Sequence, residues 1–349
     1  MNKAKLPEKF LKVVLNKRPI AMPKENDFKV ISSKLPELKK GQILVRSHYL
    51  SADPFQRMRL NKSSNYGKTL DLGDVIKGRV VGDVVKSNNL EYSIGDYVEG
   101  MLGWQEYCVS DGSKARAEYA PGITKINPKI APISTALGIL GFPGVTAYYS
   151  ILETGKLQEN ETVVVSAAAG AVGSIAGQIA KIKNCKVIGI TGTSEKADFL
   201  TKKLNFDLAL NYNFETNLTK KIIEFVPNGV DVFIDCTGGK IADAVLPTLG
   251  FNSRVVLVGN ISQNNQKKVS LRNDFQNIIM KNRSKFEGFI VYDFEDRADF
   301  AREKLSEWLN EEKLKNFETI EKGIENSPKA LISMLNGGNI GKQIIKINI

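Results

Sequence analysis

The sequence predicts an α/β protein in which a six-stranded, doubly wound parallel sheet is joined to a second, irregular β-rich lobe. The chain has 349 residues, more than a single hydrophobic core of about 250–300 residues usually accommodates. From Thr162 onward, short β-rich runs alternate with amphipathic segments of helical length. Before that point the runs are interrupted by Gly, Pro, Asn and Asp, which is typical of irregular β structure.

The alternating region supplies the strands of the parallel sheet and the helices that connect them. We expect strands at Thr162–Ala167, Lys186–Thr191, Leu208–Asn211, Val230–Asp235, Arg254–Val258 and Phe286–Val291. We expect helices at Val172–Lys183, Ser194–Leu204, Thr216–Phe225, Ile241–Leu249 and Asp274–Lys281, and a longer one at Arg297–Glu311. Each connecting helix is long enough for a right-handed crossover. Six strands are the number in a complete dinucleotide-binding domain.

The β-rich lobe is expected to contain the first part of the chain and to regain its end. Strand-like runs occur at Gln42–Ser47, Arg79–Val85, Tyr97–Val98 and, near the C-terminus, Gln343–Ile347. The expected domains are residues 1–132 for the β-rich domain, 133–312 for the parallel-sheet domain and 313–349 for a C-terminal segment that returns to the first domain.

The charge balance and the N-terminus argue against nucleic acid or a membrane as the main partner. The 49 basic residues exceed the 38 acidic ones, but the lysines occur in scattered pairs such as Lys202-Lys203, without an aromatic-basic binding motif. Met1–Ile20 lacks the apolar stretch of a signal peptide or membrane anchor. The three cysteines fit neither a disulfide framework nor a zinc knuckle, so we expect a cytoplasmic protein.

The segment Ser166–Gly173 has the features of a phosphate-binding turn. It reads SAAAGAVG and lies between an apolar strand and a helix. Gly170 would let the main chain approach a pyrophosphate, Gly173 would let the helix pack closely on the strand, and the helix N-terminus would present N–H groups. Ala168 replaces the first glycine of the usual G-x-G-x-x-G pattern, so the prediction depends on the strand–turn–helix setting. The alternative is a packing turn that binds no cofactor.

The residues after the second strand favour NADPH over NADH. An NAD enzyme has an acidic residue about 20 positions beyond the turn, where it accepts hydrogen bonds from the ribose 2′-hydroxyl. Here residues 189–194 read GITGTS, and the first acidic residue is Glu195. Lys196 instead offers positive charge to a 2′-phosphate. The alternative is that Ser194 is only the N-cap of the next helix and Lys196 a solvated residue.

The sequence does not contain the metal ligands of an alcohol dehydrogenase. A catalytic zinc needs thiolate and imidazole ligands around an open position, whereas this chain has one histidine, His48, and three dispersed cysteines, Cys108, Cys185 and Cys236. The same counts argue against a hydrolase with a histidine base. His48 lies in an alternating stretch and is expected to be an ordinary residue of the β-rich lobe.

Short motifs follow one another along nearly the whole chain. They are Asn16–Pro19, Leu50–Phe55, Leu140–Tyr148, Ala167–Gly173, Asn211-Tyr212, Gly238-Gly239, Gly288–Val291 and Gly338–Lys342. Together they resemble the zinc-independent branch of the medium-chain dehydrogenase/reductase superfamily, which contains leukotriene B4 dehydrogenase/prostaglandin reductases, plant double-bond reductases and bacterial curcumin-type reductases. The resemblance implies a Rossmann domain, a GroES-like catalytic domain, an NADPH cofactor without a metal, and a homodimer.

The resemblance also implies roles for individual positions. Four residues would hold the pyrophosphate: Gly170, Ala171, Val172 and Gly173. Lys196 and Tyr212 would contact the 2′-phosphate. The nicotinamide side would be lined by Gly259, Asn260, Ile261, Ser262, Phe289, Ile290 and Val291, with Asn339 reaching the cofactor from the C-terminal segment. Cys236 stands where relatives often carry Asn, and its thiol is a poor hydrogen-bond donor.

The implied reaction is NADPH-dependent reduction of the carbon–carbon double bond of a small α,β-unsaturated aldehyde or ketone, with hydride added to the β-carbon. The protein would orient the substrate and stabilise the oxyanion. Relatives often carry a tyrosine where this chain has Met280 or Lys281, so Tyr292 is the candidate donor to the substrate oxygen. Candidate walls of the substrate pocket, with an ordinary core position as the alternative for each, are Tyr49, Phe55, Tyr66 and Trp104.

Two other functions remain open on the sequence. The first is a quinone oxidoreductase on the same scaffold, which would oxidise NADPH faster with quinones than with enones. The second is a nucleotide-binding or RNA-binding protein with little turnover, which tight, salt-dependent RNA binding would favour.

Overall fold

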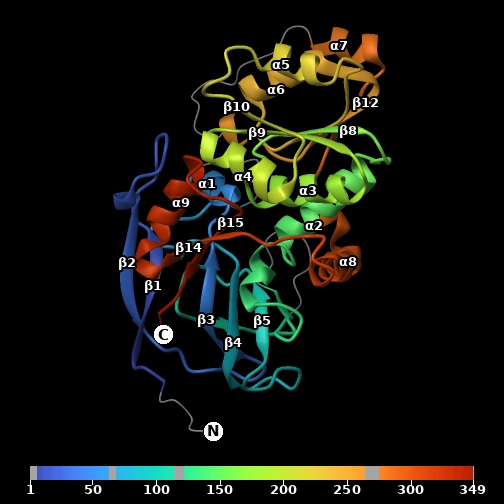
Figure 1. Ribbon diagram of the computed structural model, residues 1–349. Coiled ribbons are helices and arrows are strands. Elements are labelled where there is room, and N and C mark those ends of the chain that lie inside the picture. Colours follow the sequence, from blue (N-terminus) through green and yellow to red (C-terminus); the bar gives the residue numbers. More distant parts are fainter. Residues whose placement is uncertain (1–5, 63–67, 114–121, 264–274, 349) are drawn as a thin grey trace. The chain divides into compact units, whose positions relative to one another are not determined.

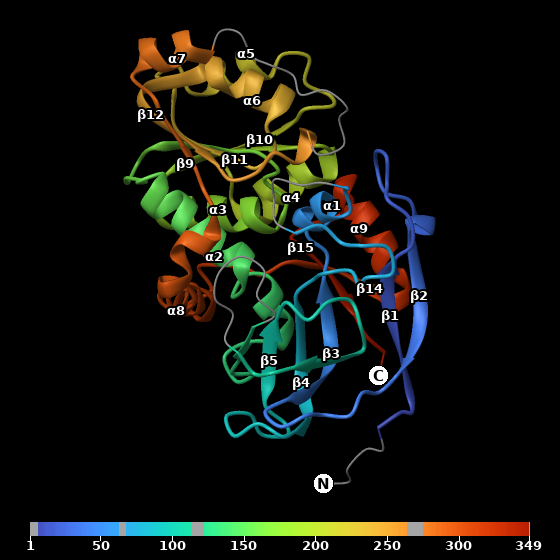
Figure 2. The ribbon, with the colours of Figure 1, turned by 180° about the vertical axis from the view of Figure 1, so that it is seen from behind.

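The computed structural model describes residues 6–62, 68–113, 122–263 and 275–348. The chain divides into two compact units, each with its own sheet (Figures 1 and 2). The first unit comprises Met1–Leu137, Thr319–Gly338 and Gln343–Ile349, and the second comprises Gly138–Glu318 and Asn339–Lys342. The short piece Asn339–Lys342 therefore belongs to the second unit, although the chain on either side of it belongs to the first.

The second unit contains the predicted parallel sheet. Its strand order is β10-β9-β8-β11-β12-β13, and all neighbouring strands are parallel. The strands are β8 (Thr162–Val165), β9 (Lys186–Thr191), β10 (Leu208–Asn211), β11 (Val230–Asp235), β12 (Leu249–Leu257) and β13 (Lys285–Gly288). The order runs outward from β8 in both directions, which confirms the doubly wound fold.

Helices cover both faces of this sheet (Figure 1). One face carries α2 (Phe142–Tyr149), α3 (Ala171–Ile182), α4 (Ser194–Leu204) and α8 (Ala298–Asn310), and the other carries α5 (Leu218–Phe225), α6 (Gly239–Val245) and α7 (Phe275–Asn282). Val163 of β8 enters the core under the first group, and Val164 enters the core under the second. Successive side chains of a strand point to opposite faces, so an uninterrupted apolar run serves both cores.

The last strand of the sheet ends earlier than predicted. A strand was expected at Phe286–Val291, but β13 ends at Gly288, and Val291–Arg297 forms a 3-10 helix, η6. Phe289 is buried in the core, where its ring stacks on that of Phe294 with the centroids 5.3 Å apart. Burial of this aromatic pair turns the chain away from the sheet edge.

The first unit is an irregular β structure, as the turn-rich sequence predicts. Its main sheet has the order β14-β15-β3-β4-β5-β7, with β6 paired to β3, and β1 and β2 form a separate pair. The strands are β1 (Lys9–Leu15), β2 (Phe28–Lys34), β3 (Ile43–Ser51), β4 (Val80–Ser87), β5 (Tyr97–Gly100), β6 (Tyr107–Ser110), β7 (Ile123–Lys125), β14 (Glu318–Lys322) and β15 (Lys342–Lys346). β15 is antiparallel to β3, with Ile345 opposite Leu50.

Two helices and several single turns complete the described elements. The helices of the first unit are α1 (Pro54–Arg59) and α9 (Ser327–Leu335). The short turns are η1 (Glu25–Asp27), η2 (Ile133–Leu137), the π-helical η3 (Ser150–Thr154), η4 (Leu246–Thr248), η5 (Ile261–Gln263) and η7 (Ile324–Asn326). In the described ranges, no helix combines the length and apolarity needed to span a membrane.

Candidate active site

The candidate active site begins at the turn between β8 and α3. Ala167 adopts a left-handed conformation with φ of 47°, and the Gly170 N–H donates to the Ala167 carbonyl at 2.8 Å. Helix α3 begins at Ala171, and its N-cap is Gly170, which has no side chain that could accept from the first N–H groups. The first N–H groups of an α-helix have no acceptor within the helix, so this N-terminus is suited to binding a negatively charged group.

Gly173 allows the helix to lie directly on this turn. A Cβ atom at position 173 would lie 2.6 Å from the Ala167 carbonyl oxygen and 2.9 Å from the Ala168 Cα. Both of these neighbours are main-chain atoms, which cannot move aside as a flexible side chain can. Glycine at this position is therefore required for the close approach of α3 to the end of β8.

The buried carboxylate of Asp235, at the end of β11, ties the turn to the neighbouring strand. Its Oδ1 accepts hydrogen bonds at 2.9 Å from the Ser166 hydroxyl and from the Thr237 and Gly238 N–H groups. Ser166 Oγ in turn accepts from the Cys236 N–H at 2.8 Å. The sequence analysis did not single out Asp235, although an acidic residue at a strand end followed by Cys-Thr-Gly-Gly is a recognisable signal.

The loop after β12 lies at the same edge of the sheet. The Gly259 N–H donates to the carbonyl of Asp235, at the end of β11, and the Ser262 N–H donates to the carbonyl of Thr237 in the following loop, at 3.1 Å each. Asn260 occupies the space at Gly238, where a Cβ atom would lie 2.2 Å from the Asn260 Oδ1. The positions expected on the nicotinamide side after β12, including Ile261 in η5, are therefore held against the loop that contains Cys236.

Cys236 is a neutral thiol in this setting. Burial, and secondarily the Asp235 carboxylate, raises the pKa of the Cys236 thiol to about 12. Because only the thiolate is a strong nucleophile, Cys236 is suited to packing rather than to reaction.

The segment Asn339–Lys342 brings the C-terminal part of the chain to the phosphate-binding turn. The Gly341 N–H donates to the Ala169 carbonyl at 2.8 Å, and Gly341 forms an isolated parallel bridge with Gly170. Asn339 is 9 % exposed, and its side-chain amide donates to the Gly341 carbonyl at 2.7 Å. Asn339 therefore lies beside the turn, although it is distant from it in the sequence.

A second group of the expected residues lies at the carboxyl ends of β9 and β10. The Tyr212 hydroxyl lies over Gly192, where a Cβ atom would be 2.9 Å from it. Thr193 is the N-cap of α4, and its side chain accepts from the Lys196 N–H at 3.2 Å. The alternative in which Ser194 caps the helix is therefore incorrect, because Ser194 is already the first residue of α4.

Lys196 carries a charge that is only partly hydrated. Burial lowers the pKa of its ammonium group, and the neighbouring Glu195 opposes this shift. Tyr212, at the end of the adjacent strand, is 43 % exposed and accessible to a ligand. An anion bound next to Lys196 would restore stabilisation that the ammonium group loses on burial.

The run after β13 divides between the core and the surface. The Phe289 side chain is buried and its N–H donates to the Leu257 carbonyl at 3.0 Å, whereas Ile290 is 42 % exposed. Val291 packs partly against the core. Tyr292 lies in η6, and its ring meets the ring of Phe142 edge-on with the centroids 5.4 Å apart.

The candidate substrate-side residues of the first unit have different environments. Tyr49 packs partly buried against a small apolar cluster, and Phe55 of α1 lies 5.3 Å from the Arg59 guanidinium. Trp104 is a core residue, because it is 0 % exposed and its indole N–H donates to the Ser51 carbonyl at 2.9 Å. Tyr66 lies outside the described residues.

The first unit has a cavity of about 450 Å³, and several of its lining residues are close in the sequence to these candidates. Its described lining includes Arg59, Lys68, Leu70, Lys77, Leu102 and Gln105. The sequence analysis missed Arg59, although a basic residue four positions after Phe55 lies on the same face of a helix.

His48 has a structural partner. Its Nε2 is 2.8 Å from Asp83 Oδ1, and Asp83 also accepts two hydrogen bonds from Arg46. Burial alone would raise the pKa of Asp83, but the hydrogen bonds from His48 and Arg46 hold it below its usual value. In the described part of the chain, no three His, Cys, Asp or Glu side chains are grouped as metal ligands.

Comparisons with known proteins agree with this geometry. A family model described as the N-terminal domain of oxidoreductase matches residues 12–117, and another, described as zinc-binding dehydrogenase, matches residues 171–309. The NADPH-dependent curcumin reductase of Escherichia coli (strain K12) is 35 % identical over 96 % of this chain and 96 % of its own. The NADP⁺-dependent 2-alkenal reductase of Nicotiana tabacum is 35 % identical over 96 % of this chain and 97 % of its own.

A solved structure extends the similarity to three dimensions. CurA from Vibrio vulnificus in complex with NADPH has a TM-score of 0.89 and 34 % identity, over 97 % of this chain and 99 % of that one. This chain belongs to the medium-chain dehydrogenase/reductase family. The resemblance inferred from the motifs is confirmed, and the medium-chain dehydrogenase/reductase fold accounts for both units.

The Ser166–Asp235 contact gives a test of how this reductase-family site is held together. Ser166→Ala removes the donor to a buried carboxylate and the acceptor of a buried N–H, so the free energy of unfolding should fall by about 1–3 kcal/mol. Ser150→Ala is the matched control, because the buried Ser150 hydroxyl only adds a bond to the Ala147 carbonyl, which already accepts a main-chain N–H. Urea unfolding should show a clearly smaller loss for the control, and equal losses would contradict the role assigned to Ser166.

Proposed function

We propose that the protein reduces the carbon–carbon double bond of small α,β-unsaturated aldehydes or ketones with NADPH. The main support is that two features lie at the same end of the sheet. One is a helix N-terminus without a side-chain cap, and the other is the partly buried Lys196, near the position where an NAD enzyme has an acidic residue. The names of two relatives, a curcumin reductase and a 2-alkenal reductase, support this reaction class.

The residues at this edge fit NADPH. The main-chain N–H groups from Gly170 to Gly173 would hold the pyrophosphate, and Lys196 with Tyr212 would hold the 2′-phosphate. The nicotinamide side would be formed by the loop after β12, residues 259–262, by the run 289–291 and by Cys236, with Asn339 next to the turn. Glycine at position 173 keeps the helix close to the strand end.

The side chains around the substrate have positioning roles in this proposal. When bound, the nicotinamide supplies the hydride that the substrate accepts at its β-carbon. Tyr292 is the candidate donor to the substrate oxygen, where negative charge develops. Tyr49 and Phe55 are the candidate apolar walls of the first unit, and no side chain is assigned as an obligatory proton donor, because solvent can protonate the α-carbon.

The proposed reaction predicts the order of activity across substrate classes. With NADPH, short alkenals or cyclic enones should be turned over faster than quinones, yielding the saturated carbonyl compound, and activity should persist in excess chelator. NADPH absorbance and product analysis would measure both. Faster turnover with quinones would favour the quinone oxidoreductase. Stoichiometric zinc that is lost together with activity would contradict the metal-free mechanism.

Lys196 should determine cofactor preference. Lys196→Ala should raise the Michaelis constant for NADPH by ~10–150-fold, since a charge-assisted contact contributes on the order of 1.5–3 kcal/mol. The constant for NADH should change little. Burial places the pKa of Lys196 below its ordinary value of 10.5. The side chain is charged at a pH below this lowered pKa, and its charge is lost as the pH rises through it. The NADPH constant should therefore rise at alkaline pH.

Lys196→Arg is the matched variant for this pH dependence. A guanidinium remains charged throughout that range, so the alkaline rise should be absent in Lys196→Arg, and it should be absent for NADH in the unmodified protein. Equal losses for both cofactors in Lys196→Ala would contradict the assignment.

Tyr292 should assist the reaction without being essential. A positioned donor typically contributes ~10²–10⁴-fold, but an enolate can take its proton from solvent. Tyr292→Phe should therefore lower turnover by less than ~10²-fold and leave NADPH binding unchanged. A larger drop with unaltered cofactor affinity would show that Tyr292 is an obligatory acid.

We also propose a homodimer that uses the edge strand β13. The last strand was expected to reach Val291 but consists of Lys285–Gly288. It is the outermost strand of the described sheet, and the outer edge of such a strand can pair with a second copy. Light scattering at micromolar concentration should give twice the 38.5 kDa mass of the chain. A monomer would reject this proposal.

A further inference from the structure

The second unit has a cavity at the end of the parallel sheet where the strands β12 and β13 begin, whereas the candidate active site lies where the strands end. Its volume is about 200 Å³, and its lining consists of Thr154, Lys156, Asn252, Arg254, Val255, Arg283, Lys285 and Glu287. Lys285 is the first residue of β13, and Arg254 pairs with it on β12. The phosphate-binding turn follows the carboxyl end of β8, so the two sites are separated by the length of the strands.

Positive charge dominates this cavity. Four of its lining residues are basic and one, Glu287, is acidic. Arg254 is paired with Glu161 at 2.5 Å. Within the described ranges, no ion pair involves Lys156, Arg283 or Lys285. Three cations that repel one another around a hollow favour an anion between them.

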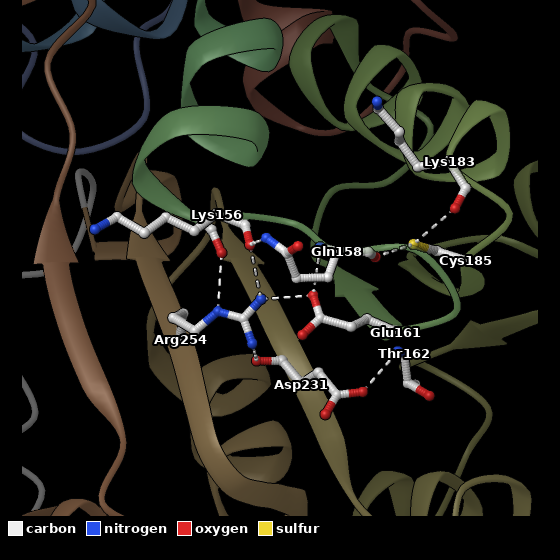
Figure 3. A network of polar contacts seen from close by, with 9 residues as sticks. Lys156, Gln158, Glu161, Thr162, Lys183, Cys185, Asp231 and Arg254 are labelled. Atoms are coloured by element: carbon white, nitrogen blue, oxygen red, sulfur yellow. Dashed lines mark hydrogen bonds and ion pairs between the residues drawn. The ribbon is translucent and has the colours of Figure 1, made fainter.

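Arg254, which lines the cavity, is held in place by the network of polar contacts in Figure 3. Its guanidinium donates to the Gly155 carbonyl at 2.9 Å, to the Lys156 carbonyl at 3.2 Å and to the Asp231 carbonyl at 3.4 Å, besides contacting Glu161. The Asp231 carboxylate is directed to the Thr162 N–H at 2.8 Å. The Glu161 and Asp231 carboxylates thus have partners of their own, and Glu287 is the one carboxylate in the lining beside the other basic side chains.

The main chain around the cavity is held in an unusual conformation. Lys156, Asn252 and Arg283 have positive φ values of 46°, 57° and 53°. They are three of the eight non-glycine residues with positive φ in the described part of the chain. Lysine and arginine rarely adopt this conformation, which costs of order 1 kcal/mol or more. The Arg283 guanidinium is also fixed, 4.4 Å from the centre of the Phe251 ring.

We propose that this cavity binds a small, multiply charged phosphate, such as pyrophosphate or a phosphate ester, at a site separate from the cofactor. A phosphate group offers several oxygen acceptors to cations that approach from different directions. The volume holds several water molecules at about 30 Å³ each, which suits a compact anion and excludes a dinucleotide. Lys156, Arg283 and Lys285 would contact the anion, and Arg254 would shape the wall.

Inorganic pyrophosphate is the probe for this site. Calorimetric titration would use protein saturated with NADP⁺, so that the turn at Gly170 is already occupied. Saturable binding is expected, and Arg283→Ser combined with Lys285→Gln should weaken it by about tenfold or more. Lys221→Gln is the matched control, because Lys221 is an exposed lysine of the same unit on α5, and it should change the affinity by less than about twofold.

Glu287→Gln provides a variant with the opposite expected effect. Removing the one carboxylate of the lining should strengthen pyrophosphate binding by about two- to fivefold. No saturable binding up to about 10 mM, loss of binding on saturation with NADP⁺, or equal weakening by Lys221→Gln would each overturn the proposal. The readout requires no turnover, so failure of the reductase assignment would leave this result interpretable.

Discussion

The carboxylate of Asp235 is the interaction on which the candidate active site depends. It is 2 % exposed, and a buried charge is tolerated only where donors replace its lost hydration. The donors come from Ser166, at the start of the phosphate-binding turn, and from Thr237 and Gly238 in the loop after β11. The turn and this loop therefore cannot move independently, and the loop after β12 is bonded to the same segment. One carboxylate thus fixes the turn after β8 and the loops after β11 and β12 relative to one another.

The carboxyl and amino ends of the strands in a parallel sheet differ chemically. The two candidate anion sites of this protein lie at opposite ends of the strands and would attract an anion in different ways. At the carboxyl edge, the helix N-terminus of α3 and the partly buried Lys196 favour phosphate groups through main-chain N–H groups and one side chain. At the amino ends of the strands, none of the described helices begins next to the cavity lined by Lys156, Arg283 and Lys285. Attraction of an anion there must come from side chains. A glycine pattern therefore marks the first candidate site in the sequence, whereas side chains gathered from separate segments leave no motif for the second.

Most of the fold, and less of the site, could be predicted from the sequence. The bounds of β9, β10 and β11 were predicted correctly because a short apolar run between turn residues forms a buried strand in a parallel sheet. The end of β13 was predicted wrongly, because Phe289 leaves the strand to stack on Phe294, a contact that local pattern does not encode. The contact between Gly341 and Ala169 has the same character, since it joins residues that are far apart in the sequence.

The missing first glycine of the phosphate-binding pattern is compensated elsewhere in the structure. Ala168 stands at that position and is fully buried, and the left-handed conformation of the turn falls on Ala167. The Ala168 methyl group packs beside Gly189 of β9, where a Cβ atom would lie 3.0 Å from the Ala168 Cβ and still closer to Leu200 and Phe206. The turn places Gly170 at the start of α3 at the cost of a strained alanine, Ala167, of order 1 kcal/mol.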